Sequence, residues 1–251
     1  MGNRAEADLI FGSGVRSMRF QGYAMIIGAM KSGTTTLHHI LTQHPEIVPG
    51  VRKELNFFKR RKKRTRGVAA YEALFPRLDK ARYAYTLDSS PNYTKPGRWD
   101  FAPRRIAALP GRKRLIYVLR DPIERIDSHI AHNVAEGRWT AEDWPVERVL
   151  DISAYARQLA KFEDAGLLDD VLLVDFSELT VDPIGVAYRV HDFLGIGRVA
   201  PNSVEVRNPR KLDARFLRQD QLPQLKQQLQ SDVETLITRY GFEPARSWAI
   251  V

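Results

Sequence analysis

The chain has no cysteine among its 251 residues, and this absence excludes disulfide bonds and thiolate metal sites. It also lacks the run of about 18 apolar residues that a membrane-spanning helix requires. The first 22 residues contain no apolar core of the kind that a signal peptide carries. We therefore expect a cytoplasmic protein with no membrane span, although the lack of cysteine does not itself identify the compartment.

Internal repeats are absent too, and no long linker rich in proline, glycine and serine divides the chain. A length of 251 residues suits one α/β domain, and a hydrophobic content of 43% is enough to build a full core. Disorder of the whole chain is therefore excluded. We predict a short N-terminal extension over 1–22 and a single domain over 23–251.

Positive charge is concentrated in one segment, KRRKKRTR, at residues 59–66. The formal net charge is +9, and removing the seven basic residues of this segment leaves +2. The segment is consistent with a solvated loop, or with recruitment of an acidic acceptor such as an anionic glycan, lipid headgroup or carboxylated metabolite. A nucleic-acid-binding arm is a weaker alternative, because no aromatic residues are interleaved with the cations for base stacking.

Short apolar runs alternate with segments of helical periodicity along the chain. We expect strands over 23–29, 82–88, 114–120 and 170–176, and helices over 68–75, 102–109, 122–135, 151–165, 183–194 and 220–240, with a further helix after the first strand. This alternation predicts a single α/β domain with a central, mostly parallel sheet flanked by helices. In such sheets ligands bind at the carboxyl ends of the strands, so residues that follow strands are the candidates for function.

A P-loop-like turn follows the first expected strand, in the stretch IIGAMKSGTTTLHHIL. Gly28 and Gly33 have the spacing of a nucleotide-triphosphate P-loop, but Lys31 precedes the second glycine and Thr34 stands where the P-loop lysine would be. Backbone N–H groups at the start of a helix, aided by nearby hydroxyls and a lysine, bind anions. An ordinary strand–turn–helix capped by serine and threonine remains the alternative on the glycine spacing alone.

A second candidate anion site lies in LIYVLRDPIERIDSHIAH, residues 115–132. Arg120 ends an apolar strand, Pro122 begins a helix, and Ser128 follows the arginine by eight residues. An arginine at this point can hold a phosphate through two hydrogen bonds, and a serine hydroxyl on the helix can donate a third. The alternative is that Arg120 only pairs with a neighbouring acidic residue.

Together the two motifs resemble those of sulfotransferases that use 3′-phosphoadenosine 5′-phosphosulfate (PAPS), over roughly residues 23–248. The likeness is greater to the heparan-sulfate and bacterial type than to the cytosolic aryl type. It implies PAPS as donor, 3′-phosphoadenosine 5′-phosphate (PAP) as product and no metal, with the first loop on the 5′-phosphosulfate and the second motif on the 3′-phosphate. The donor-binding residues it assigns are Lys31, Ser32, Gly33, Thr34, Thr35, Thr36, Arg120 and Ser128, joined by Arg210 and Lys211 of RNPRK, for which a solvated basic loop is the alternative.

The same resemblance implies two catalytic residues. Lys31 would stabilise the leaving phosphate, and Glu54 would act as general base in an in-line displacement at sulfur. Glu54 lies in VRKELNFFKR, whose E-x-x-F-F pattern is similar to the segment that carries the catalytic glutamate in the heparan-sulfate group. The alternative is a surface pair between Glu54 and Lys53; His129 and His132 are weaker candidates for the base.

The segment LDSSPNYT resembles a further family element, usually E-K-S-P-x-Y. Asp88 takes the glutamate position and Ser89 the lysine position, which puts a heparan-type acceptor in doubt. Tyr93 is retained and is a candidate to line the acceptor pocket. The acceptor is therefore predicted only as a hydroxyl or amine, of an acidic glycan, a lipid or a small metabolite.

Two functions outside this family are weighed against it. A P-loop kinase or NTPase with an atypical loop is disfavoured by the position of Lys31, since a P-loop lysine follows the turn and reaches the β- and γ-phosphates. A protein that binds polyanions or nucleic acid through residues 59–66 would need neither phosphate motif. Oligomeric state is left open by the sequence.

Overall fold

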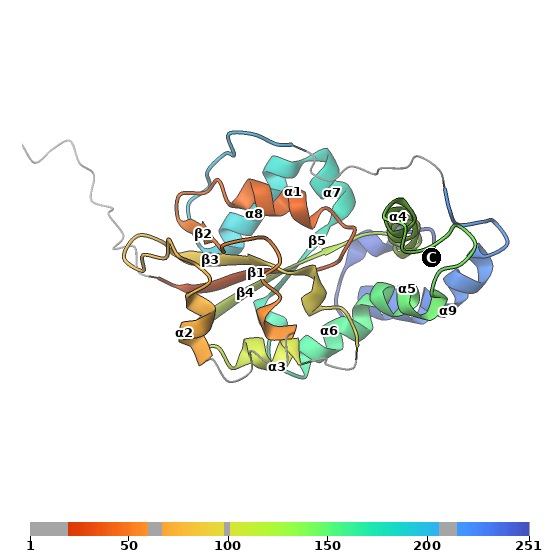
Figure 1. The fold of residues 1–251 in the computed structure, drawn as a ribbon, viewed down its shortest axis with the longest axis horizontal. Helices are drawn as coiled ribbons and strands as arrows, with labels where there is room; N and C mark the ends of the chain where they lie inside the picture. The colour runs from red at the N-terminus through yellow and green to blue at the C-terminus, as the bar shows by residue number, and fades with distance from the viewer. Residues whose placement is uncertain (1–19, 60–66, 98–100, 206–214, 251) are drawn as a thin grey trace, which may run out of the picture.

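The computed structural model describes residues 20–59, 67–97, 101–205 and 215–250. Five parallel strands form one sheet in the order β2-β3-β1-β4-β5. The strands are β1 (Gly22–Gly28), β2 (Ile47–Pro49), β3 (Tyr85–Ser89), β4 (Arg112–Leu119) and β5 (Val171–Asp175). Helices cover both faces of this sheet (Figure 1), so the predicted α/β fold is confirmed.

Nine α-helices are found in the described part of the chain. They are α1 (Thr34–Leu41), α2 (Gly67–Glu72), α3 (Ala102–Ala107), α4 (Pro122–Ala135), α5 (Val146–Ser153), α6 (Tyr155–Glu163), α7 (Phe176–Val181), α8 (Pro183–Leu194) and α9 (Leu222–Thr238). Four short 3-10 helices, η1 (Phe57–Lys59), η3 (Pro91–Tyr93), η4 (Leu168–Asp170) and η5 (Glu243–Ser247), complete the regular structure of the described residues. The helices α1, α7 and α8 cover one face of the sheet, while α2, α3 and α6 lie on the other (Figure 1).

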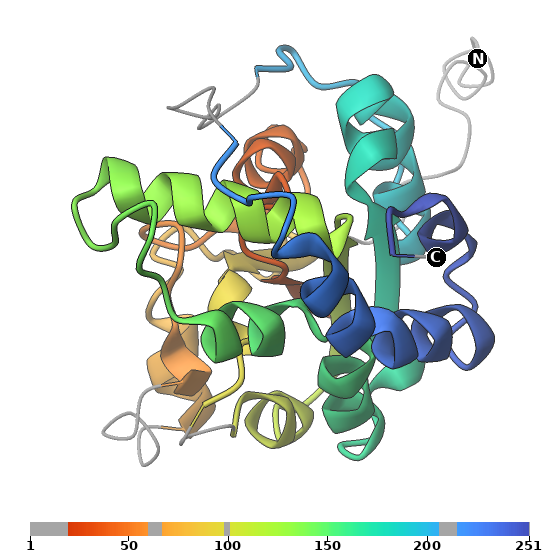
Figure 2. The ribbon, with the colours of Figure 1, turned by 90° about the vertical axis from the view of Figure 1, so that its right-hand side faces the viewer.

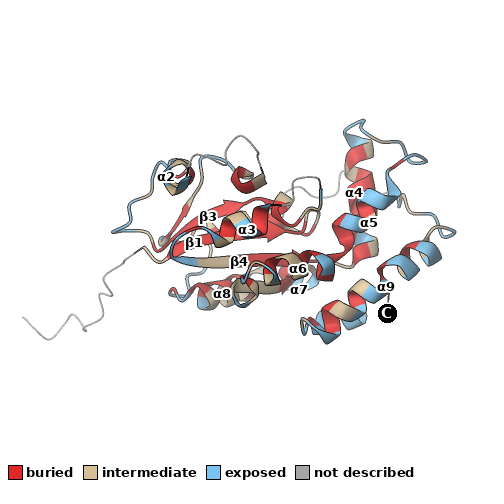
Figure 3. Cartoon of the chain, turned by 90° about the horizontal axis from the view of Figure 1, so that it is seen from below, coloured by how far each residue is buried: buried red, intermediate tan, exposed pale blue. Residues whose placement is uncertain are grey.

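The carboxyl ends of the strands point toward α4, α5 and α9, which pack against one another beyond the sheet (Figures 1 and 2). All seven residues of β1 are buried, as expected for the central strand of a sheet that is covered on both faces. Alternate residues of β1 enter two separate cores: Met25 and Ile27 join the core under α3, α6 and α9, and Ala24 and Ile26 join the core under α1 and α8. Figure 3 shows the buried sheet between these layers.

Two predicted helices are observed with the bounds expected from the sequence. α4 and α8 each begin at an Asp-Pro pair, where the aspartate caps the helix and the proline takes the first turn, and both run over the predicted ranges 122–135 and 183–194. The predicted helix over 151–165 is wrong as one element, because Ala154 adopts ψ 78° and separates α5 from α6. The predicted strand over 82–88 begins three residues later, at Tyr85, and the short strand β2 was not expected.

Candidate active site

The loop between β1 and α1 turns through two residues with left-handed backbone, Lys31 at φ 69° and Gly33 at φ 73°. Gly33 is the N-cap of α1 and offers no side chain to the first turn, whose first helical bond runs from Leu37 N to Gly33 O at 3.1 Å. The amides of the first turn therefore have no acceptor within the helix and point out of its positive end. The Ser32 hydroxyl is buried and has no hydrogen-bond partner among the described residues. This is an anion-binding geometry.

The two glycines of the loop are required by packing and conformation. A Cβ atom at Gly28 would lie 2.5 Å from Thr94 Oγ1 and 2.7 Å from the Tyr117 ring. A Cβ atom at Gly33 would lie 3.1 Å from Leu179 and would also need a left-handed backbone that L-residues seldom adopt. The glycine spacing that resembles a P-loop is thus explained without a nucleotide triphosphate.

Arg120 joins the two predicted anion sites. It follows β4, and its Nη1 donates a 3.2 Å hydrogen bond to the Lys31 carbonyl oxygen, so the loop after β1 and the start of α4 meet at one edge of the sheet. The guanidinium also pairs with Glu124 at 3.1 Å and lies over the Phe176 ring at 4.6 Å. The Glu124 side chain is 61% exposed, and such pairs contribute only about 0–1 kcal/mol, so a phosphate can compete for the guanidinium.

A cavity of about 340 Å³ opens beside Arg120, between α4 and the segment that leads into α9. Arg215 and Lys226 add positive charge to its wall, and Asp121, Glu124 and Asp127 line it as well. Asp127 accepts hydrogen bonds from the backbone amides of Phe216 at 2.7 Å and Leu217 at 3.0 Å, so it ties this segment to α4. The predicted Ser128 is buried on the same helix and is not among the residues that line this cavity, and the predicted Arg210 and Lys211 lie outside the described residues.

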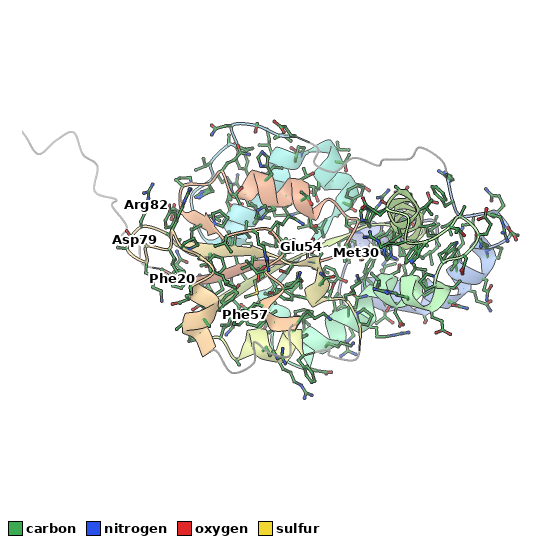
Figure 4. All side chains as sticks on the ribbon, viewed as in Figure 1. Phe20, Met30, Glu54, Phe57, Asp79 and Arg82 are labelled. Carbon is green, nitrogen blue, oxygen red and sulfur yellow. The ribbon has the colours of Figure 1, made fainter. Side chains whose placement is uncertain are left out.

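Glu54 lies in a loop between β2 and η1, toward the carboxyl ends of the strands (Figure 4). Its side chain is 43% exposed, pairs with Lys53 Nζ at 3.3 Å and receives a long 3.5 Å contact from Asn92 Nδ2. Phe57 and Phe58 are buried in the core. The surface ion pair between Glu54 and Lys53, which was the alternative considered from the sequence, is present. The Glu54 carboxylate is still exposed enough to be within reach of a ligand.

Backbone conformation singles out the same residues. In the described part of the chain, Lys31, Glu54 and Asn56 are the non-glycine residues with positive φ. For Lys31 and Glu54 this conformation costs about 1–2 kcal/mol, whereas asparagine adopts it more readily. Such strain is found mostly at functional sites, where surrounding contacts hold it. Two of the three are the residues that the sequence pattern proposed as catalytic.

The element resembling E-K-S-P-x-Y is buried deeper than expected. Asp88 and Tyr93 are fully buried, so the prediction that Tyr93 lines the acceptor pocket is wrong. The Tyr93 hydroxyl instead donates a 2.6 Å hydrogen bond to the Asp88 carboxylate. Ser89, at the usual lysine position, lies 2.7 Å from His38 Nδ1. Burial, with Lys53 and His39 nearby, lowers the pKa of His38 to about 4.

The histidines of α4 differ in environment. Burial, followed by the charges of Arg125 and Lys95, lowers the pKa of His129 to about 2, and its Nδ1 lies 3.5 Å from Arg125 Nη1. A group that holds a proton so weakly is a poor general base near neutral pH. His132 lies at a more exposed point, with Nε2 3.2 Å from Arg138 Nη2.

Comparison with known proteins identifies the family. The model of the family described as "Sulfotransferase domain" matches residues 22–221. This chain belongs to the sulfotransferase family. The resemblance drawn from the two phosphate motifs is therefore confirmed.

The curated relatives of this sulfotransferase domain have names that specify heparan sulfate as their substrate. Heparan sulfate glucosamine 3-O-sulfotransferase 6 of Homo sapiens is 32% identical over 191 residues, which are 70% of this chain and 53% of that protein. Heparan sulfate glucosamine 3-O-sulfotransferase 3B1 of Mus musculus is 30% identical over 197 residues, which are 70% of this chain and 46% of that protein. The chain thus spans about half the length of these relatives.

The fold of this sulfotransferase domain is also found in a solved structure, the sulfotransferase from Alicyclobacillus acidocaldarius. The TM-score is 0.70 at 23% identity, over 91% of this chain and 99% of that one. This likeness confirms the fold. Among the described residues, no helix of this sulfotransferase domain is both long and apolar enough to cross a bilayer, and no cluster of three potential metal ligands is present.

Two charged groups near the site, Arg125 and Lys95, were not singled out from the sequence. Arg125 is fully buried and donates to Ser153 Oγ and the Val149 carbonyl oxygen, and burial lowers its pKa to about 10. Burial, with Arg148 next, lowers the pKa of Lys95 to about 8. These contacts join distant parts of the chain, so no local pattern reveals them.

Proposed function

We propose that the chain is an enzyme that moves the sulfuryl group of PAPS to a hydroxyl or amine of an acceptor. Family membership supports sulfuryl transfer and the donor. The observation that carries the proposal is the 3.2 Å contact between Arg120 Nη1 and the Lys31 carbonyl oxygen, because it brings two anion-binding elements together at the carboxyl edge of the sheet. A donor with a phosphate group at each end needs two such elements.

The residues at this edge fit the donor. On the side of the loop, the buried Ser32 hydroxyl, which has no partner in the described part of the chain, and the open N-terminus of α1 suit the 5′-phosphosulfate, together with Gly33, Thr34, Thr35 and Thr36. On the side of α4, Arg120 suits the 3′-phosphate, and Arg215 and Lys226 add cations to a cavity whose wall also carries Asp121, Glu124 and Asp127. Ser128, which is buried on α4, stays a prediction for this end. Arg210 and Lys211 stay predictions for the same end.

Catalysis then needs a base for the acceptor and a positive charge near the leaving group. When bound, PAPS supplies an activated sulfuryl group. The Glu54 carboxylate takes the acceptor proton, and its exposed position leaves it open to an acceptor. The Lys31 ammonium and the amides of the loop stabilise negative charge that develops on the phosphate side. Lys53, which pairs with Glu54, helps to orient that carboxylate.

An anionic glycan is the acceptor class that we favour. The curated relatives bear names that specify glucosamine of heparan sulfate, and the charges of Lys53, Lys59 and Lys95 lie on the Glu54 side. Ser89 in place of the family lysine argues for an acceptor that differs in detail from heparan sulfate. Because the chain spans about half of each relative, its acceptor is not carried over from them. A cytoplasmic location stays a prediction from the sequence.

The test is transfer of labelled sulfuryl from PAPS to a panel of acceptors. The panel contains N-sulfated and unsulfated glycosaminoglycan chains, anionic lipids and small phenols and amines, and the Lys31→Ala variant is the matched control. We expect labelled product with at least one anionic glycan and none with the control. Absence of transfer to every acceptor, with PAP binding intact, would contradict the proposed activity.

A further inference from the structure

The loop that presents Glu54 is held in an unusual backbone conformation. Glu54 and Asn56 have φ angles of 63° and 50°, and neither is glycine. Asparagine adopts this conformation readily, but at Glu54 it persists only where neighbouring groups hold it in place. The contacts that do so come from the strand end and 3-10 helix at 88–93, which lie more than 30 positions away in sequence.

Three consecutive backbone amides after Glu54 are bound by this segment. The amide of Leu55 donates to the Asp88 carboxylate. The amide of Asn56 donates to Ser90 Oγ at 3.0 Å, and the amide of Phe57 donates to Tyr93 Oη at 3.1 Å. The Glu54 amide itself donates to the Ser89 carbonyl oxygen at 3.0 Å.

Asp88 is the acceptor on which these contacts depend. The hydroxyls of Ser90 and Tyr93 each donate to its carboxylate at 2.6 Å, and the Tyr71 hydroxyl lies 3.4 Å from the same group. By donating to Asp88, the two hydroxyls turn their lone pairs toward the amides of the Glu54 loop. The carboxylate is fully buried, so it has no contact with a ligand at the surface.

We propose that Asp88 is a positioning residue for sulfuryl transfer: through Ser90, Tyr93 and the Leu55 amide it fixes the loop that aims the Glu54 carboxylate at the acceptor. This inference rests on the proposed function, with Glu54 as base. A neutral side chain of the same shape would not accept from all of these donors, because an amide has one acceptor oxygen and presents a donor at the other position. Burial raises the pKa of Asp88 to about 6, so the carboxylate form is the one present at neutral pH.

The experiment is a double-mutant cycle of Asp88→Asn with Glu54→Gln. Initial rates with PAPS and the acceptor from the panel give kcat and KM for each variant, and calorimetric titration with PAP gives donor binding separately. We expect Asp88→Asn to lower kcat about 10- to 100-fold, the usual cost of misplacing a catalytic group, with PAP affinity unchanged. In the Glu54→Gln background the same substitution should change kcat less than about twofold, because the group that it positions is already gone.

A milder pair of variants covers the outcome that Asp88→Asn does not fold. Tyr93→Phe removes the hydroxyl that links Asp88 to the Phe57 amide, and it should lower kcat in the wild-type background only. Tyr85→Phe is the matched control, since Tyr85 is equally buried and donates one side-chain bond, to Gln21 Oε1 at 3.2 Å, at the opposite end of β3. It should leave kcat within about twofold of wild type.

Two results would overturn the inference. One is an equal loss of kcat from Asp88→Asn, or from Tyr93→Phe, in the wild-type and Glu54→Gln backgrounds, which would assign the effect to general destabilisation. The other is unchanged kcat in correctly folded variants. Failure of the proposed function is distinguishable, because it would appear as an inactive wild type or as a fully active Glu54→Gln variant.

Discussion

Lys31 and Glu54 share a left-handed backbone conformation, with φ angles of 69° and 63°, although they lie in separate loops. Neither residue is one that tolerates this conformation easily, since a Cβ atom then crowds the following carbonyl oxygen. Lys31 follows the central strand, and Glu54 is held by the end of the neighbouring strand. Both residues are proposed to be catalytic. Backbone strain at the two positions supports a functional site in which the required geometry is kept at a cost in stability.

Replacing Lys31 by alanine should lower kcat about 100-fold or more, because it removes the positive charge proposed to face the leaving phosphate. The Lys31→Gly variant should lose as much activity but unfold at a higher temperature than Lys31→Ala, since glycine adopts φ 69° without strain. Steady-state rates and thermal denaturation measure the two effects. Lys80→Ala, which removes an exposed lysine paired with Glu72, is the control and should retain full activity. Wild-type rates in Lys31→Ala would refute the role.

Replacing Glu54 by glutamine should lower kcat by about 100-fold or more while PAP binding is kept, because only the proton acceptor is lost. The informative comparison is His129→Gln, at a residue whose pKa of about 2 makes it a poor base. We expect this variant to keep kcat within about tenfold of wild type. If the order of the two losses were reversed, His129 would be the base.

Replacing Gly28 by alanine should destabilise the fold strongly, because the new Cβ would lie 2.5 Å from Thr94 Oγ1 and 2.7 Å from Tyr117. We expect a loss of about 1–3 kcal/mol, the range for overpacking a tight site. Gly137→Ala places its Cβ in open space, so it should lose only the roughly 1 kcal/mol of stability that the positive φ of 68° costs an alanine. Gly197→Ala meets nothing within 4 Å and should lose least. Urea denaturation of the three variants should rank them in this order, and equal midpoints would contradict the packing argument.

The free energy of unfolding should fall as the pH is lowered, because His191 is buried without its proton in the folded chain. Burial, with His44 at a ring distance of 4.6 Å, lowers the pKa of His191 to about 4, and both ring nitrogens lack partners among the described residues. The unfolded chain takes up the proton near pH 6.5 and the folded chain only near pH 4, so this contribution to stability is present above pH 6.5 and is lost as pH falls toward 4.

The variant His191→Phe isolates this contribution, because it removes the titrating group without removing a hydrogen bond seen in the described part of the chain. Urea denaturation at about pH 7.5 and about pH 5 should show a smaller loss of free energy of unfolding on acidification in the variant than in the wild type. Parallel losses would mean that His191 takes no part in the pH dependence. Comparing each protein with itself at the higher pH removes any packing difference between histidine and phenylalanine.

The parts of the fold that were predicted well have strong local signals. The bounds of α4 and α8 follow from Asp-Pro starts, and α8 ends at Gly195 in the left-handed conformation. The break at Ala154 carries no such signal, since neither proline nor glycine marks it, and β2 has only three residues.

In the candidate site, too, the residues marked by a local motif were predicted and those defined by long-range contacts were not. Lys31 and Arg120 were found because each lies in a short motif directly after a strand, where parallel sheets place their ligands. The buried acceptor Asp88 was found only as a departure from a family pattern, because its role depends on contacts with residues 55–57 across the fold. Tyr93 was wrongly assigned to the acceptor pocket, because the sequence does not show that its hydroxyl donates to Asp88.

Donor binding is tested most directly by calorimetric titration of the protein with PAP and, in parallel, with ATP and Mg²⁺. We predict one PAP bound per chain, with affinity reduced at least about tenfold in Arg120→Ala, the usual effect of losing a charge-assisted phosphate contact. ATP with Mg²⁺ should bind far more weakly than PAP. Tight binding of ATP with Mg²⁺ and none of PAP would contradict the assignment of the two anion sites to a PAPS-type donor.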